Sequence, residues 1–295
     1  MPLAPHESGA PTVGVVGAGT MGVGIAYVFA AAGCPTTVAE PDAARSAALV
    51  QVLREQAGKG VARGKLTPER AAALPDLVQV VPSPAELPEG LGLVVESVPE
   101  RLALKHEVLA AVQERSPRLL ATNTSALSVD ELAGRLDRPE AFLGMHFFNP
   151  VWSLQMVELV RGAKTADQAV ADAQALVALL GKRSIVVRDV PGFATSRLDV
   201  VTALEAMRML ESGVASAEDI DTAMTVAYRH PMGPLRLSDV VGLDVRLDIA
   251  QNLSAVYGER FAPPQVLVDL VAAGHLGQKT GRGFFSWDPP TLEHA

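Results

Sequence analysis

The chain has 295 residues, 48% hydrophobic and 20% charged, which is long enough for one large or two ordinary globular domains. A formal net charge of -8 and an aromatic content of only 4% exclude a general nucleic-acid surface, which needs basic stripes and stacking platforms. The single cysteine, Cys34, excludes an internal disulfide, and the spacing of the six histidines predicts no metal site.

The N-terminal region has no feature of a membrane or export segment. The apolar stretch Met21–Ala32 is preceded by no lysine or arginine, since the first basic residue is Arg45. It is also too short and too interrupted by glycine to cross a bilayer. We therefore expect a cytoplasmic enzyme that does not associate with membranes.

In the first half of the chain, short apolar or β-branched runs alternate with longer helix-forming segments. Residues 1–10 are predicted to be a loose tail. The predicted strands are Thr12–Val16, Thr36–Ala39, Leu91–Ser97 and Leu119–Asn123. The predicted helices are Met21–Ala32, Ala43–Arg63, a short one opened by Thr67-Pro68, and Arg101–Arg115. This alternation predicts a parallel, doubly wound, Rossmann-like α/β sheet.

The second half changes from mixed to purely helical structure. A strand around Glu158, a helix over Ala166–Leu180 and a strand over Arg183–Val187 are predicted first. The helices predicted after them are Phe193–Glu211, Ala217–Val226, Asp239–Ala255 and Gln265–Ala273. We therefore expect a Rossmann-like domain over residues 11–190, an all-helical C-terminal domain over 191–288 and a tail over 289–295. These helices are apolar on more than one face, which favours a homodimer formed through this half.

The strongest local motif is Gly17-Ala18-Gly19-Thr20-Met21-Gly22, which follows the first predicted strand and opens the first helix. In that context G-x-G-x-x-G indicates dinucleotide binding. The first glycine permits a tight turn, the second admits the pyrophosphate, and the third lets helix and strand pack closely. We predict that the residues of this loop, Thr20 and Met21 included, bind the cofactor.

Glu40 lies at the end of the second predicted strand, about 20 residues beyond the motif, where a carboxylate can accept hydrogen bonds from the adenosine ribose. A carboxylate there repels a ribose phosphate, so the sequence favours NAD over NADP. Arg45 is close enough in sequence to leave some tolerance of NADP open.

His146 and Glu158 form the most informative pair of polar residues. His146 lies in Gly144-Met145-His146-Phe147-Phe148-Asn149-Pro150, and Glu158 interrupts an apolar run where a hydrophobic residue is expected. A buried carboxylate needs a partner, and imidazole can transfer protons near neutral pH. The pair predicts a histidine base oriented by a glutamate. A histidine bonded to a backbone carbonyl, beside a glutamate that faces water, fits the same residues.

Several motifs in the right order together resemble the 3-hydroxyacyl-CoA dehydrogenases, especially the single-function 3-hydroxybutyryl-CoA type. The resemblance spans roughly residues 13–287. The motifs are the glycine loop, Asn123-Thr124-Ser125, His146 to Pro150 with Glu158, Asp219-Ile220-Asp221, Pro231-Met232-Gly233-Pro234 and Lys279-Thr280-Gly281-Arg282-Gly283-Phe284.

The resemblance implies a role for each matching residue. His146 would be the catalytic base, Glu158 would orient it, and Ser125 would contact the substrate. Glu100 and Lys105 would contact the cofactor, although a solvated helix start also explains them.

Two asparagines join this predicted site. Asn123 and Asn149 are predicted to border the cofactor, and Asn149 to fix the nicotinamide or its loop. Turn or capping roles fit both residues, and Ser125, equally well.

One position departs from the family pattern. The family usually carries an asparagine where this chain has Ser196, in Gly192-Phe193-Ala194-Thr195-Ser196-Arg197. A serine hydroxyl can still donate one hydrogen bond to the substrate oxygen, but it reaches less far than an amide. Trp152 likewise lies in a stretch where the family often has a lysine, and ordinary packing explains it equally well.

A coenzyme A substrate brings several phosphates to an acidic protein. Lys59, Arg63 and Lys65 form a compact basic group that could receive them, or else a solvated helix end. An acidic acyl carrier protein would use the same residues.

The sequence therefore predicts reversible, NAD-dependent oxidation of a short (S)-3-hydroxyacyl-CoA to the 3-ketoacyl-CoA. One alternative is a dehydrogenase of the same fold acting on a free 3-hydroxy acid or a carrier-bound hydroxyacyl group. Another is a non-enzymatic NAD(H)-binding protein.

Overall fold

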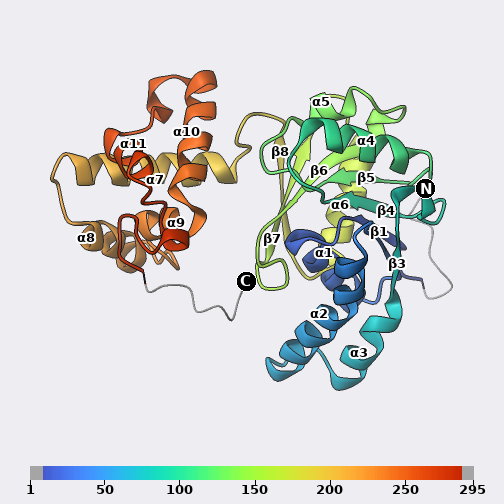
Figure 1. Ribbon diagram of the computed structural model, residues 1–295. Helices are drawn as coiled ribbons and strands as arrows, with labels where there is room; N and C mark the ends of the chain where they lie inside the picture. Colours follow the sequence, from blue (N-terminus) through green and yellow to red (C-terminus); the bar gives the residue numbers. More distant parts are fainter. Residues whose placement is uncertain (1–8, 288–295) are drawn as a thin grey trace. The chain divides into compact units, whose positions relative to one another are not determined.

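A computed structural model describes residues 9–287 (Figure 1). The chain divides into two compact units, the first ending at Val190 and the second beginning at Pro191. Apart from residues 9 and 10, the two predicted tails, 1–10 and 289–295, lie outside the described residues.

The first unit is built on one eight-stranded sheet. Its strands are β1 (Val13–Val16), β2 (Thr36–Ala39), β3 (Val78–Val81), β4 (Leu93–Glu96), β5 (Leu120–Thr122), β6 (Phe142–Phe147), β7 (Met156–Arg161) and β8 (Arg183–Arg188). Their spatial order is β3-β2-β1-β4-β5-β6-β7-β8. The central strands β1 and β4 are buried along their whole length, as expected for a parallel sheet covered on both faces.

Helices cover both faces of this sheet (Figure 1). They are α1 (Thr20–Ala31), α2 (Ala43–Ala62), α3 (Pro68–Ala73), α4 (Leu102–Gln113), α5 (Val129–Ala133) and α6 (Asp167–Leu179). Apolar side chains of α1 and α6, among them Phe29 and Leu176, join those of the strands in one hydrophobic cluster. With the helical unit described below, this confirms the predicted doubly wound α/β fold followed by helices.

The sheet differs from the prediction near one edge. β7 runs antiparallel to β6, whereas every other neighbouring pair is parallel. The physical reason is the connection between them, residues 148–155, which is too short for the crossover that a parallel pair requires. β3 and β6 were not predicted as strands. In β3 only Val78 is buried, and the strand therefore has a weak apolar signal in the sequence.

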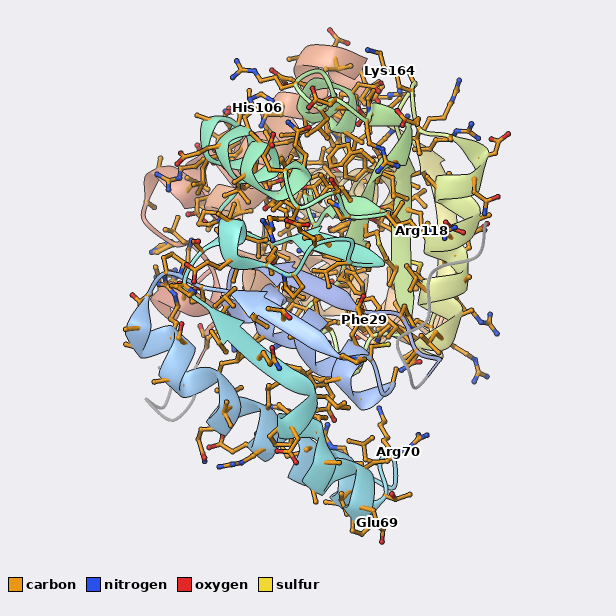
Figure 2. The ribbon with its side chains drawn as sticks, turned by 90° about the vertical axis from the view of Figure 1, so that its right-hand side faces the viewer. Phe29, Glu69, Arg70, His106, Arg118 and Lys164 are labelled. Atoms are coloured by element: carbon orange, nitrogen blue, oxygen red, sulfur yellow. The ribbon has the colours of Figure 1, made fainter. Side chains whose placement is uncertain are left out.

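The helices α2 and α3 extend from the sheet and pack against each other. Figure 2 places Glu69 and Arg70, both on α3, at the far end of this pair. Asp42 caps α2. Thr67 caps α3, with Pro68 at the first helical position, as the sequence predicts.

In the described part of the second unit, helices are joined by loops, and two isolated β-bridges lie near its end. Its helices are α7 (Thr195–Glu211), α8 (Ala217–Thr222), α9 (Pro234–Val241), α10 (Leu243–Tyr257) and α11 (Gln265–Ala272), with a π-helical stretch over Ala223–Ala227. The predicted single helix Asp239–Ala255 is wrong, because Gly242 has a φ of +102° and separates α9 from α10. Within residues 9–287, no helix combines the length and apolar character needed to cross a membrane.

Candidate active site

The loop between β1 and α1 has the geometry of a phosphate cradle. Gly17 has a φ of +96°, which favours glycine. A Cβ at Gly22 would lie 1.8 Å from the carbonyl oxygen of Gly17, so a side chain is excluded there. Around Gly19, no described heavy atom outside its chain neighbours lies within 4 Å of where a Cβ would stand. Since no side chain caps the N-terminus of α1, this open loop fits a pyrophosphate.

Glu40 follows β2 directly and lies beside this loop. Its carboxylate accepts hydrogen bonds from the backbone N–H of Ala18 (2.8 Å), the backbone N–H of Asp42 (2.9 Å) and Nη2 of Arg45 (2.9 Å). Burial raises the pKa of Glu40, but Arg45 and the two backbone N–H groups outweigh that effect and hold the pKa below its usual value. The anionic carboxylate suits ribose hydroxyls and disfavours a ribose phosphate.

A pocket of about 820 Å³ lies along the carboxyl ends of β1, β2, β4, β5 and β6. Open α/β sheets bind their ligands at this edge. The predicted site residues in its lining are Gly17, Gly19, Thr20, Met21, Glu40, Glu100, Asn123, Ser125, His146 and Asn149. Gly22, Lys105 and Glu158 are buried and are not part of this lining.

His146 and Glu158 face each other across the antiparallel pair β6 and β7. Nδ1 of His146 lies 3.1 Å from Oε2 of Glu158, whose side chain is 0% exposed. The His146 side chain is 10% exposed, and it packs against Phe148 with 4.3 Å between ring centres. The arrangement can hold one histidine tautomer and stabilise an imidazolium.

Asn123 fixes the backbone beside this pair. Its backbone N–H donates to the carbonyl of Glu96 (2.8 Å), and its side-chain oxygen accepts the N–H of Phe147 (2.9 Å). Asn123 therefore ties the end of β5 to the residue that follows His146. Asn149 lines the pocket, and its peptide bond to Pro150 is cis.

Lys105 is fully buried behind the pocket and bridges two carboxylates. Its Nζ lies 2.7 Å from Oε1 of Glu96 and 3.3 Å from Oε2 of Glu100. Burial raises the pKa of Glu100, but hydrogen bonds from Thr124 and from the backbone near Ser125, together with the Lys105 charge, lower it below its usual value. Sequence reasoning missed Glu96, although a charge that ends the apolar run Leu93–Glu96 was a visible signal.

The predicted basic group lies on the exposed end of α2 and the turn after it. Lys59, Arg63 and Lys65 are exposed, and none of them lines the pocket. Lys182, which the sequence did not single out, donates from Nζ to the carbonyls of Val151 and Leu154, at 2.6 Å each. Burial lowers the pKa of Lys182, and the nearby charge of Lys65 lowers it further.

Ser196 belongs to the second unit, where it lies half-buried in the first turn of α7. The backbone before this helix turns sharply, with φ angles of +74° at Gly192 and +46° at Phe193. Trp152 lies in the first unit, where its ring meets Tyr27 edge-on, with 6.2 Å between ring centres. This contact supports the packing explanation for Trp152.

Two family models together match nearly the whole described chain. The NAD-binding domain of 3-hydroxyacyl-CoA dehydrogenase matches residues 12–190, and the C-terminal domain of the same enzyme matches residues 192–287. The chain belongs to the 3-hydroxyacyl-CoA dehydrogenase family. This dehydrogenase is therefore an oxidoreductase that uses NAD, as its sequence predicts.

Individual relatives agree with the family models. A 3-hydroxybutyryl-CoA dehydrogenase of Mycobacterium tuberculosis is 41% identical over 93% of this chain and 98% of its own length. A probable 3-hydroxybutyryl-CoA dehydrogenase of Bacillus subtilis is 35% identical over 94% of this chain and 97% of its own. The crystal structure of (S)-3-hydroxybutyryl-CoA dehydrogenase PaaH1 from Ralstonia eutropha superposes with a TM-score of 0.89, at 35% identity, covering 95% of this chain and 99% of that one.

Proposed function

We propose that this dehydrogenase interconverts a short (S)-3-hydroxyacyl-CoA, of the 3-hydroxybutyryl-CoA kind, and its 3-ketoacyl-CoA. The observation that carries the proposal is the pairing of His146 with the buried Glu158 at the rim of a pocket that begins at a dinucleotide loop. The names of the relatives support the acyl-CoA substrate.

NAD, when bound, supplies the acceptor for the hydride that leaves the carbinol carbon. We assign proton transfer to Nε2 of His146, because Nδ1 faces the Glu158 carboxylate at 3.1 Å. Glu158 would stabilise the imidazolium as the proton arrives, and in the reverse direction the same nitrogen returns the proton to the developing alkoxide.

The other predicted residues would position the two ligands. We propose that Ser125 and Ser196 donate hydrogen bonds to substrate oxygens and that Lys59, Arg63 and Lys65 receive the phosphates of coenzyme A. In support, Lys65 lies near enough to Lys182, which binds the segment after His146, to lower the pKa of Lys182. The proposed cofactor contacts are Gly17, Gly19, Thr20, Met21, Gly22, Glu40, Glu100, Lys105, Asn123, Ser125 and Asn149.

Two further proposals concern the whole protein. We propose a homodimer through the second unit, which is supported by its exposed apolar side chains, among them Leu198, Val226 and Val245. We propose the cytoplasm as its location, since a single buried cysteine suits a reducing compartment.

The decisive experiment is NADH oxidation with acetoacetyl-CoA. We expect robust turnover by the native enzyme, and a loss of kcat of ~10² to 10⁴ in His146→Gln, typical of a missing general base, with NADH binding retained. The matched control is His106→Gln, since His106 lies on α4 in contact with the carbonyl of Glu131 (Figure 2).

Two outcomes would contradict the proposal. Unchanged turnover in His146→Gln would refute the histidine base. Turnover with free 3-hydroxy acids or with a carrier-bound acyl group, but not with the coenzyme A thioester, would instead favour the alternative substrate classes.

A further inference from the structure

The loop after β5 is folded around a single carboxylate oxygen. We call residues 124–127 the Ser125 loop. Oε1 of Glu100 accepts the hydroxyl of Thr124 and the backbone N–H groups of residues 125, 126 and 127, the last three at 3.0, 3.1 and 3.4 Å. Successive N–H groups that converge on one point form a nest that binds an anion. The fold of this loop therefore depends on a negative charge at Glu100.

Thr124 completes the nest from the protein interior. Its side chain is 0% exposed, and its Oγ1 accepts the N–H groups of Ala126 (3.3 Å) and Leu127 (2.9 Å) while donating to Glu100. Because it is fully buried, Thr124 can influence the pocket only through the backbone of the loop and through Glu100.

The Glu100 carboxylate is itself held from two sides. Oε2 lies 3.3 Å from Nζ of Lys105, whose side chain is 1% exposed and which also binds Glu96 at 2.7 Å. Glu96 in turn accepts the hydroxyl of Thr122 on β5 at 2.7 Å. A buried ion pair therefore links two strands of the sheet to the carboxylate that shapes the loop.

Among the described residues, no hydrogen bond holds the side chain of Ser125 in the way that Thr124 and Glu100 are held. It is exposed, lines the same pocket as His146, and its hydroxyl makes no hydrogen bond to the described residues. Only the backbone of the loop therefore fixes where that hydroxyl points.

We propose that Glu100 is a positioning residue, which acts on the reaction by folding the loop that carries Ser125. Lys105 supports it by fixing the carboxylate between Glu96 and the loop. This role is separate from any contact that Glu100 makes with the cofactor, and it rests on the proposed function, in which Ser125 holds the substrate.

A double-mutant cycle tests the proposal at saturating NADH, which removes effects on cofactor affinity. The variants are Glu100→Gln, Ser125→Ala and their combination, with kcat/KM for acetoacetyl-CoA as the readout. We expect Glu100→Gln to lower kcat/KM by ~10²-fold, the usual effect of an ångström-scale misplacement. The double variant should then be little worse than the poorer single variant, because both changes remove the same interaction. Effects that multiply in the double variant would overturn the proposal.

Thr124→Val provides a second variant that touches neither ligand. It should lower kcat/KM in the same direction while the dissociation constant of NADH stays within about twofold, because the buried side chain contacts only the loop and Glu100. An equal loss of NADH affinity and of kcat/KM in both variants would overturn the proposal. The matched control is Glu107→Gln, an exposed residue on the same helix as Lys105, which should leave kcat/KM unchanged.

Amide hydrogen exchange gives a readout that needs no activity. Exchange at residues 125–127 should speed up in Glu100→Gln and Thr124→Val but not in Glu107→Gln, with the unfolding midpoint as a check on folding. Unchanged exchange in properly folded variants would overturn the proposal. If the native enzyme fails to reduce acetoacetyl-CoA, the proposed function falls, and the exchange result still decides whether Glu100 folds the loop.

Discussion

At the scale of single residues, Glu158 has no contact with the pocket and yet faces its histidine. Its side chain is 0% exposed inside β7, and its Oε2 lies 3.1 Å from Nδ1 of His146. A carboxylate buried at this depth is tolerated only with a partner. We therefore interpret the Glu158 carboxylate as the partner of His146, although Glu158 lies within an apolar strand.

The variant Glu158→Gln should show whether Glu158 orients His146 or only fills space in the protein interior. The amide keeps the size of the side chain but cannot stabilise an imidazolium or select the same tautomer, so kcat should fall by ~10²-fold. The dissociation constant of NADH should hardly change. The check is steady-state kinetics beside fluorescence titration of NADH. A variant with native kcat would show that Glu158 serves packing alone.

We propose that Glu40 and Arg45 determine the choice between the two nicotinamide cofactors. Both oxygens of Glu40 are engaged by donors, and Arg45 reaches it at 2.9 Å while its own side chain is 56% exposed. Glu40→Ala removes the repulsion and releases a guanidinium that can bind a ribose phosphate.

The ratio of kcat/KM for NADPH to that for NADH should therefore rise at least ~10-fold in Glu40→Ala, as expected for one charge-assisted contact. Adding Arg45→Ala should reverse most of the gain. If the ratio stays at its native value in Glu40→Ala, Glu40 does not determine cofactor choice.

At the scale of elements, the junction of β1 with α1 combines two glycines with opposite surroundings. A Cβ at Gly22 would collide with the carbonyl oxygen of Gly17 at 1.8 Å, whereas the space at Gly19 is open. Both glycines belong to one sequence motif, and their surroundings fit the separate roles that the motif predicts for them, room for a ligand at Gly19 and close packing at Gly22.

Gly22→Ala should therefore affect stability, whereas Gly19→Ala should affect NADH binding. Gly22→Ala should lower the free energy of unfolding by about 1–3 kcal/mol or more, because helix and strand must separate. Gly19→Ala should keep the native unfolding midpoint but weaken NADH binding at least ~10-fold, or about 1.4 kcal/mol. Denaturant unfolding and NADH titration check both. Equal destabilisation by the two changes would contradict this assignment.

The antiparallel strand β7 shows what local pattern cannot predict. Its run Met156–Val160, apolar except for Glu158, is a strand in sequence and in structure, but its direction follows from the short connection after Phe147. That direction places Glu158 opposite His146. The strand that places Glu158 beside His146, the proposed catalytic pair, is therefore the one that departs from the parallel prediction.

At the scale of the whole molecule, most of the large exposed apolar side chains in the described residues belong to the second unit. They are Leu198, Val214, Val226, Tyr228, Val240, Val241, Val245 and Val256. Surfaces of this kind mark association sites in soluble proteins, and we assign this one to a second copy of the chain.

Sedimentation velocity should give the mass of a dimer at micromolar concentration. Leu198 is 68% exposed, and Leu198→Glu should raise the dimer dissociation constant by at least ~10²-fold, because burial of leucine contributes about 1.5–3 kcal/mol at each of two equivalent positions. The matched control is Leu179→Glu, a residue of α6 in the first unit that is 45% exposed. A monomer mass at every concentration would contradict the dimer.

By itself, the sequence determined the fold class, the cofactor loop and the family. These properties depend on local periodicity, on glycines that no other residue can replace, and on motifs that lie within short stretches. Tertiary structure alone decided how distant charges are paired. Glu96, Glu100 and Lys105 are neighbours in sequence and form ion pairs with one another. The hydrogen bonds from the Ser125 loop to Glu100 span 25 residues, and they form because β4 and β5 lie side by side. Hydrogen bonds and ion pairs depend on distances of a few ångströms, which the order of residues along the chain does not contain.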